Sequence, residues 1–484
     1  MSKYYVNFSI LMLFAICINF TSCDNLFPSK PNNPENENPE DNDNPGETEN
    51  PITVDNGLAY VFDFEAIPEI TLHFPLEEWN DLLSKYDANN DTKEYVHCDV
   101  TFKKGDDVFN INNSGVRLRG NTSRRRPENG SGTHVGGGQA DWQHCHFGLN
   151  FRKYEKDNNH EIGGIRKINL KWFNNDPTYV REVFSYDLFH RAGVWTAAEI
   201  CYSRLWIEVE GDPKPAYYGV YSMIEPYDNK YIERKIDKFE NADGNLWKCT
   251  YTSNGPADLR NENANMGEDD NLHEYTYELK ETEVGFDLAK AQLQHFIRTL
   301  NSKDNGDEFA EWFSQICDVQ LFIKTYAVSV ALGMWDDHWN NGNNYYLYFN
   351  STDPENYKVF FLPYDYDNTL GTSNCYDPAK QNPTEWGTMG KLMQRVIKTP
   401  QYKQMFIDEL KKIVVPENGL MDYNNSSARI REWQNRIKDY IANDTGEDME
   451  IKDEAAQWSN YKYSLLNSSS NNYFIEKAKA INNL

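Results

Sequence analysis

The order of the predicted secondary-structure segments constrains the fold of this chain more than any other feature. Strand-like segments, alternating or continuously apolar, dominate residues 68–250 and are interrupted by a few helical segments. Beyond Gly285 helical periodicity dominates, and only residues 344–349 and 359–363 read as strands. This order predicts an α+β protein with a sheet-rich first lobe, a helix-rich second lobe and a cleft between them.

The segments are predicted individually from their periodicity and their flanking turn residues. We expect strands over residues 68–74, 95–102, 108–111, 115–119, 146–151, 167–172, 204–210, 217–224 and 245–250. We expect helices over residues 76–86, 177–192, 229–236, 386–397, 401–413, 428–441 and 453–463, and one buried helical face between residues 313 and 334. The Gly-rich, polar residues 121–143 predict a long mobile loop.

The N-terminal residues are typical of an exported lipoprotein. Lys3 precedes an apolar stretch over residues 6–20, and small residues precede Cys23 as in a bacterial lipobox. This pattern predicts cleavage before Cys23 and its acylation; the alternative is an ordinary signal peptide in which Cys23 is incidental. Residues 23–56, rich in Pro, Asn, Glu and Asp, predict an extended acidic tether. We therefore expect a cell-envelope protein, periplasmic or at the cell surface, held to a membrane by N-terminal acyl chains.

Charge and cysteine content exclude several classes of protein. The chain has 48 Lys and Arg residues against 75 Asp and Glu residues, a formal charge of −27. Because nucleic-acid affinity comes mostly from cationic contacts to phosphates, we expect no nucleic-acid partner. The eight cysteines contain no C-x-x-C spacing, which argues against a disulfide scaffold and against a structural zinc site and favours free buried thiols.

One segment is basic and rich in hydrogen-bond donors in this otherwise acidic chain. It reads Gly115-Val116-Arg117-Leu118-Arg119-Gly120-Asn121-Thr122-Ser123-Arg124. A strand places Arg117 and Arg119 on the same face, and the residues that follow offer backbone and hydroxyl donors. The segment predicts an anion-binding cradle; the alternative is an exposed hairpin with solvated arginine side chains.

Two segments rich in Asn and Asp flank the predicted strands 344–349 and 359–363. They read Trp335-Asp336-Asp337-His338-Trp339-Asn340-Asn341-Gly342-Asn343-Asn344 and Pro363-Tyr364-Asp365-Tyr366-Asp367-Asn368-Thr369-Leu370-Gly371. Carboxylates and carboxamides are the ligands that magnesium prefers, and Asp336 precedes Asn341 by the spacing of a protein-kinase catalytic loop. These segments predict a magnesium–phosphate site; the alternative is ordinary capping of helix and strand ends.

Taken in order, these and other segments resemble the spore-coat protein H (CotH) family. The resemblance rests on the run from Gly115 to Arg124 and on Ile168-Asn169-Leu170-Lys171, Tyr179-Val180-Arg181-Glu182, Tyr218-Gly219-Val220-Tyr221-Ser222-Met223-Ile224-Glu225-Pro226, Gly244-Asn245-Leu246-Trp247-Lys248, Asn344-Tyr345-Tyr346-Leu347-Tyr348 and residues 365–371. These pieces occur in family order over roughly residues 67–400. The resemblance divides the chain into a signal peptide (1–22), the tether (23–56), a CotH kinase-like domain (57–415) and a C-terminal helical segment (416–484) packed on the second lobe.

The resemblance implies a two-lobed atypical kinase-like fold that uses ATP and Mg²⁺ or Mn²⁺ to phosphorylate Ser or Thr hydroxyls of a protein acceptor. Asp336 resembles the catalytic aspartate, with Asp337 as the alternative. Asn344 and Asp365 would bind the metal ion, with Asp367 assisting. Nucleotide-phosphate contacts or an orienting ion pair would come from Arg119, Lys171, Glu225 and Lys248.

Two other functions are compatible with the same sequence. The first is a catalytically silent surface lipoprotein that binds a glycan or a protein partner, suggested by the tether and by the 14% aromatic content. The second is a polysaccharide hydrolase using paired carboxylates such as Asp365 and Asp367.

Overall fold

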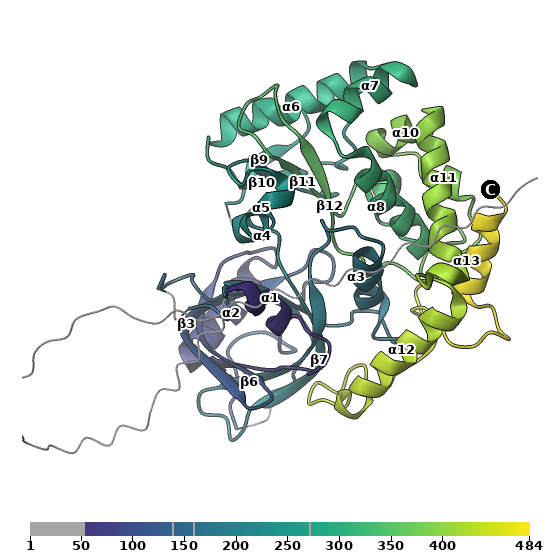
Figure 1. The fold of residues 1–484 in the computed structure, drawn as a ribbon. Helices are drawn as coiled ribbons and strands as arrows, with labels where there is room; N and C mark the ends of the chain where they lie inside the picture. The colour runs from purple at the N-terminus through teal and green to yellow at the C-terminus, as the bar shows by residue number, and fades with distance from the viewer. Residues whose placement is uncertain (1–53, 138–139, 158–159, 271–272) are drawn as a thin grey trace, which may run out of the picture. The chain divides into compact units, whose positions relative to one another are not determined.

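The computed structural model describes residues 54–137, 140–157, 160–270 and 273–484, and Pro51–Leu484 form one compact unit (Figure 1). The predicted signal peptide and Cys23 lie outside the described residues. Only residues 54–56 of the predicted tether are described, and they begin helix α1. The elements of both kinds confirm the predicted α+β class.

Seven strands of the described residues close into a barrel, in the order β1-β2-β3-β4-β5-β7-β6. The strands are β1 Glu69–Phe74, β2 Val96–Lys104, β3 Asp107–Arg119, β4 His146–Asn150, β5 Lys167–Lys171, β6 Ile200–Val209 and β7 Ala216–Ile224. Neighbours pair antiparallel except β6 with β1, whose parallel pairing closes the barrel. Side chains of β2 alternate between buried and accessible positions, so one face of the strand lines an apolar interior.

The two strands predicted over residues 108–111 and 115–119 form the single strand β3. Cys98 pairs with Ser114 and Val100 with Ile111, so β3 has one residue more than β2 at this point and forms a bulge. Asn113 lies in this bulge with a φ of 53°, in the left-handed region. The residues between the two predicted strands therefore form a bulge, which bends the strand without ending it.

A second sheet has the order β12-β11-β8-β10-β9 and combines segments distant in the sequence. Its strands are β8 Asn245–Cys249, β9 Met266–Glu268, β10 Tyr277–Glu281, β11 Tyr345–Phe349 and β12 Val359–Pro363. Strand β8 pairs with both β10 and β11, and all five residues of β11 are buried. The predicted strand at 245–250 thus belongs with the late strands 344–349 and 359–363, and not with the barrel.

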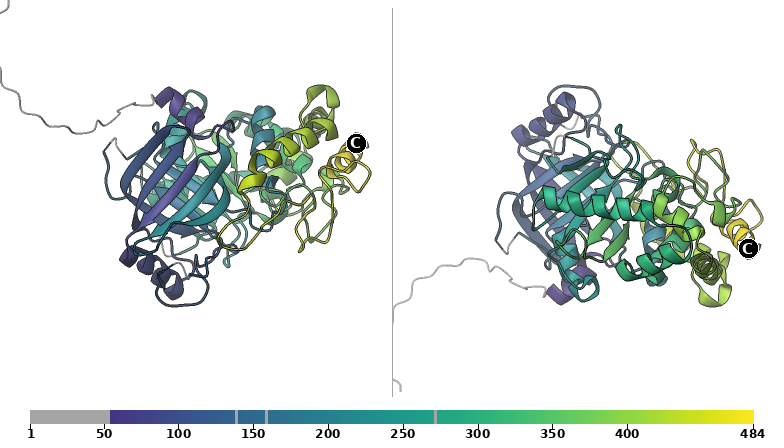
Figure 2. Two further views of the ribbon diagram at one scale, coloured as in Figure 1. Left: turned by 90° about the horizontal axis from the view of Figure 1, so that it is seen from below. Right: turned by 90° about the horizontal axis from the view of Figure 1, so that it is seen from above.

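Helices flank the barrel and cover the second sheet. They are α1 Val54–Val61, α2 Leu76–Ala88, α3 Arg181–Arg191, α4 Asn229–Arg234, α5 Ile236–Phe239, α6 Phe286–Ser302, α7 Asp307–Ile316, α8 Val319–Leu332, α9 His338–Asn341, α10 Lys391–Ile397, α11 Pro400–Val414, α12 Tyr423–Ile437 and α13 Tyr473–Asn482. Short 3₁₀ turns occupy Pro383–Glu385, Pro416–Asn418 and Lys438–Tyr440. In Figure 2 the barrel strands lie to one side of the helices near the C-terminus.

Several helix predictions need correction. The single face predicted between residues 313 and 334 spans two helices, because Asp318 accepts the Leu321 N–H (3.0 Å) and starts α8 anew. The helix predicted over 453–463 is absent, because the Asp453 carboxylate accepts the backbone N–H groups of Leu465 and Leu466, both at 2.8 Å. The last helix of the chain, α13, was not predicted.

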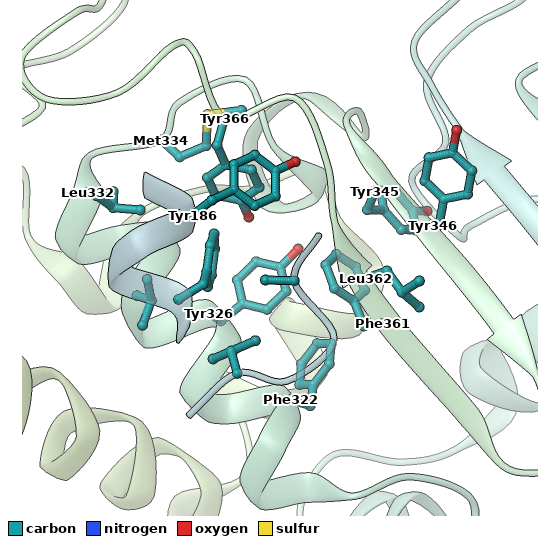
Figure 3. Packing of buried hydrophobic residues seen from close by; sticks show 14 of the residues in the cluster. Tyr186, Phe322, Tyr326, Leu332, Met334, Tyr345, Tyr346, Phe361, Leu362 and Tyr366 are labelled. Carbon is teal, nitrogen blue, oxygen red and sulfur yellow. The ribbon is translucent and has the colours of Figure 1, made fainter. Parts of the chain in front are cut away.

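Two apolar clusters hold the described residues together, one inside the barrel and one among the helices and the second sheet. In the second cluster Tyr186 of α3 packs against Tyr366, and Tyr326 of α8 packs against Phe361 of β12 (Figure 3). All six cysteines of the described ranges are free thiols. No described helix has both the length and the hydropathy that a membrane-spanning helix needs.

Candidate active site

Lys171, the last residue of β5, is buried at the centre of a cluster of carboxylates, of which Glu182 is buried and Asp365 and Asp367 are half-buried. Its Nζ donates to Glu182 Oε1 (2.7 Å) and to the Asp365 carboxylate, and Asp367 Oδ2 lies 3.7 Å away. Burial disfavours the ammonium, but the charges of the three carboxylates outweigh burial and raise the pKa of Lys171 well above its ordinary value. Lys171 is therefore a permanent positive charge that joins the barrel to two other segments.

Glu182 reaches Lys171 because a tight turn connects β5 to α3. The Asp176 carboxylate accepts the backbone N–H groups of Thr178 (3.0 Å) and Arg181 (2.9 Å), which directs the chain into the helix. Glu182 then lies in the first helical turn, 4% exposed. Burial raises the pKa of Glu182, and the neighbouring Lys171 charge only partly offsets it.

Asp365 and Asp367 follow β12 on either side of the buried Tyr366. Asp365 adopts a φ of 61°, an uncommon conformation for a residue with a side chain. Burial alone would raise its pKa, but the positive charges of Lys171, Arg119 and Lys248 lower it below the ordinary value. The pKa of Asp367 is raised instead, because burial and the charges of neighbouring carboxylates outweigh Lys171. The pair therefore consists of one ionised carboxylate and one that holds its proton more tightly.

Asp336 lies between α8 and α9 and is held by asparagine side chains. Its Oδ1 accepts from Asn341 Nδ2 (2.8 Å) and Asn343 Nδ2 (3.0 Å), and its Oδ2 accepts from Asn344 Nδ2 (3.1 Å). Burial raises the pKa of Asp336, the amides lower it in part, and the negative charge of Asp365 raises it further. The two segments are joined directly, since the Tyr364 N–H donates to the Asn344 carbonyl (3.3 Å).

Asp337 has a different environment from its neighbour. It is 1% exposed, its Oδ1 accepts the Asn340 N–H (2.9 Å) that caps α9, and its Oδ2 accepts from the Ser329 hydroxyl (3.3 Å). Burial raises the pKa of Asp337 to about 7. Both of its oxygen atoms are thus bound within the fold.

The predicted cationic positions on the barrel and the second sheet meet at Tyr364. Arg119 of β3 donates from Nη2 to the Tyr364 hydroxyl (2.8 Å), and Lys248 Nζ of β8 lies 5.6 Å from the centre of the Tyr364 ring. Arg124 donates to the backbone carbonyls of Asn90 (3.2 Å) and Thr92 (3.1 Å). The predicted basic segment therefore contacts protein groups and places Arg119 beside Asp365.

Glu225 lies outside this cluster. Its carboxylate pairs with Arg234 and accepts the Glu199 N–H (3.2 Å), and it is 2% exposed. The structure therefore brings together Arg119, Lys171, Lys248, Asp336, Asn344, Asp365 and Asp367, whereas Glu225 belongs to a separate ion pair.

Sequence reasoning did not assign a role to Glu182, Asn341 or Asn343. Glu182 stood in one of the quoted segments, and its signal was a carboxylate in the first turn of the helix that follows the Lys171 strand. The signal for Asn341 was its catalytic-loop spacing from Asp336, whereas Asn343 stood in a run of Asn residues with no feature to separate it from capping residues.

The donor set fits a divalent cation bound with a phosphate group. Asp365, Asp367 and the Asn344 carboxamide supply oxygen atoms, which hard cations prefer, from segments that β11 and β12 hold together. Lys171, Arg119 and Lys248 supply positive charge on the same side. The site therefore combines oxygen ligands with cationic side chains within an α+β fold.

Comparison with known proteins gives the family. The chain matches the family model described as CotH kinase protein over residues 116–472, and it belongs to that family. Curated relatives include Invasin CotH3 of Rhizopus delemar, 23% identical over 214 residues (44% of this chain, 33% of the relative). Invasin CotH2 of the same organism is 22% identical over 323 residues, 65% of this chain and 46% of the relative. The chain therefore spans less than half the length of each of these relatives.

Proposed function

We propose that the protein is an atypical protein kinase that transfers the terminal phosphoryl group of ATP to Ser or Thr hydroxyls of a protein acceptor. The observation that supports this most directly is the contact of Lys171 with both Glu182 and Asp365. In protein kinases a strand lysine pairs with a helix glutamate and lies near a metal-binding aspartate. Family membership points to the same activity.

The order of the groups along the chain supports the same proposal. Lys171 and Glu182 come first, then Asp336 with Asn341 five residues later, then a strand pair and Asp365. This is the order of the equivalent groups in protein kinases. In the proposed two-lobed arrangement, the barrel is the first lobe and the second sheet with its helices is the other.

Each residue of the site has a proposed task. Asp336, fixed by its asparagine neighbours, orients the acceptor hydroxyl and receives its proton. Asp365 and Asn344 would hold Mg²⁺ or Mn²⁺, with Asp367 assisting, and Arg119 and Lys248 would face the phosphates. The cation, when bound, supplies charge neutralisation for ATP, which matters because the chain carries a formal charge of −27.

Asp336 is the better candidate of the two adjacent aspartates. Both aspartates accept hydrogen bonds at both carboxylate oxygens, but Asp337 is almost fully buried, where an acceptor hydroxyl cannot reach it. Asp336 is half-buried, and the charge of Asp365 raises its pKa. We therefore assign Asp337 a structural role and leave Glu225 out of the proposed site.

Transfer of label from ATP tests the proposal. The full-length protein would be incubated with γ-labelled ATP and Mn²⁺ and compared with Asp365→Ala, Asp336→Asn and the control Asp439→Ala, an exposed carboxylate outside the site. We expect label on the protein or on a generic acceptor, lost by at least a hundredfold in the first two variants and retained in the control. Equal labelling in all four proteins would contradict the assignment.

Adhesion is the second candidate function. Both curated relatives carry the name invasin, and this favours a surface protein that binds a glycan or a protein partner without catalysis. A thermal-shift measurement separates the candidates. Stabilisation by ATP only when Mg²⁺ or Mn²⁺ is present supports the kinase, whereas a response to oligosaccharides alone supports the binder.

We also propose that acyl chains on Cys23 hold the protein at a membrane of the cell envelope. The lipobox-like residues before Cys23 support this proposal. Cells supplied with labelled palmitate should yield labelled native protein and unlabelled Cys23→Ala protein. Equal labelling of both proteins would contradict the anchor.

A further inference from the structure

Helix α10 carries three cationic side chains on one face. Lys391, Arg395 and its C-cap Lys398 are separated by four and three residues, which places them in one row along the helix; α10 itself is labelled in Figure 1. Arg260 joins this row, because its guanidinium donates to the carbonyls of Thr388 (2.8 Å) and Met389 (2.9 Å) directly before the helix. We call these four residues the basic stripe.

The four charges lie close enough to influence each other. Burial lowers the pKa of Lys391, and the positive charges of Arg395, Arg260 and Lys398 lower it further. Such clustering of like charges is unfavourable unless an anionic group offsets it. The stripe is therefore an unusual feature in a chain with a formal charge of −27.

The stripe has little compensation within the protein. Asp258 lies 3.5 Å from Arg260. In the described ranges, Lys391, Arg395 and Lys398 make no ion pair with a carboxylate, and nearby Glu308 pairs with Lys303 at 3.3 Å. Arg395 donates instead to Asn305 Oδ1 (2.8 Å) and to the Asn301 carbonyl (3.0 Å). Lys391 is half-buried and Lys398 is exposed, so their two ammonium groups are accessible from solvent, whereas the Arg395 guanidinium is held by Asn301 and Asn305.

The stripe rests on the segment that contains Asp336. The backbone N–H groups of Met389 and Gly390 both donate to the Trp339 carbonyl, at 2.9 and 3.0 Å. On the Arg260 side, the Ala257 N–H donates to the Gly342 carbonyl (2.7 Å). Both supports of the stripe thus attach to residues 339–342, a few residues after the proposed catalytic aspartate.

We propose that the basic stripe binds acidic residues of the polypeptide acceptor, so that the preferred acceptors carry Asp or Glu near the target Ser or Thr. This inference rests on the proposed kinase function and names the substrate class for the same site. A seven-residue helix is about 10 Å long, which corresponds to roughly three residues of an extended peptide. The carboxylates of the site repel an acidic acceptor, so such an acceptor needs a separate cationic surface on which to bind.

Two matched peptides test the proposal with the full-length protein. One is Gly-Glu-Glu-Glu-Ser-Glu-Glu-Glu-Gly, and in the other every Glu is replaced by Gln. Peptide binding is measured by fluorescence anisotropy and phosphoryl transfer by steady-state kinetics. The variant is the double substitution Lys391→Gln and Lys398→Gln. Its matched control is Lys411→Gln with Lys438→Gln, which removes the same charge from one half-buried and one exposed lysine elsewhere.

We expect the native protein to bind the Glu peptide more tightly than the Gln peptide. The stripe variant should weaken binding and raise KM for the Glu peptide about fivefold, with kcat and the Gln peptide unchanged, because two exposed charge pairs are lost. The preference should also fall in 0.5 M salt, since the pairs are screened. The control variant should behave like the native protein.

The two proposals fail in distinguishable ways. Equal weakening in the stripe and control variants, or no preference of the native protein for the Glu peptide, would overturn the stripe proposal. Stripe-dependent binding without any phosphoryl transfer would support the basic stripe as a surface that binds acidic peptides, and it would overturn the kinase function instead.

Discussion

The side-chain amide of Asn344 contacts Asp336 twice, at its backbone carbonyl (2.9 Å) and at its Oδ2 (3.1 Å). Asn344 adopts a φ of 59°, in the left-handed region, directly before β11. The contact joins a proposed metal ligand to the proposed catalytic aspartate. The backbone conformation at one residue thus fixes the distance between two parts of the candidate site.

Substitution of Asn344 should separate the effect of its side chain from that of its backbone. Asn344→Ala loses both hydrogen bonds and keeps a Cβ in a left-handed conformation, whereas Asn344→Gly loses only the bonds. We expect the Ala variant to have a free energy of unfolding about 1 kcal/mol lower than that of the Gly variant. Urea unfolding measures this difference, and both variants should lose labelling activity. Equal stability of the two variants would mean that the conformation carries no cost.

The pH dependence of stability should reveal the buried Asp337. Its pKa is about 7 in the folded protein and about 3.8 unfolded, so the folded state binds the proton more tightly. The free energy of unfolding therefore falls as the pH rises from about 4 to about 7. Asp337→Asn removes this loss, and we expect its stability relative to the native protein to improve with pH by on the order of 2 to 4 kcal/mol.

Urea midpoints between pH 4.5 and 8 measure this effect. Asp422→Asn, another buried helix cap, shows what the same chemical change does at a comparable position. A constant difference between Asp337→Asn and the native protein across this pH range would contradict the prediction.

Removal of the Lys171 charge should destabilise the protein strongly. Lys171→Ala leaves the nearby carboxylates without their central cation, and we expect a loss of about 3 to 5 kcal/mol at pH 7.5. The double variant Lys171→Ala with Glu182→Gln should recover part of this loss, since one buried charge is removed. Chemical unfolding of the single and double variants measures the coupling. Additive losses would show that Lys171 and Glu182 are energetically independent.

The Asp453 carboxylate should stabilise the folded conformation of the C-terminal residues. It accepts the backbone N–H groups of Leu465 and Leu466, and α13 follows shortly afterwards. Asp453→Ala should cost about 2 to 3 kcal/mol, because the two amides lose a charged acceptor. Asp453→Asn keeps one carbonyl oxygen and should cost less. Thermal unfolding compares the variants, and an equal cost for both would show that the acceptor oxygen is unimportant.

The local pattern of the sequence was sufficient to predict the α+β fold class and the positions of most strands. Alternation predicted the residues of β1, β2 and β5 closely, because a strand with one buried face repeats every two residues. The Asn- and Asp-rich segments around Asp336 and Asp365 were predicted to lie together, and the strand pair β11 and β12 brings their ends together. The order of the family segments was also readable without a structure, and the family is confirmed.

Only the tertiary structure decided which strands pair and which charges meet. Nothing in β6 indicates that it pairs parallel with β1 and closes a barrel, because a strand carries the period of its burial and not the identity of its neighbour. Likewise, Lys171 meets Glu182 and not Glu225, since the Asp176 turn directs α3 back over β5 while Arg234 pairs with Glu225. The sequence by itself determined the kinds of segment and the chemical groups of the site; long-range pairing and burial determined which of those groups share it.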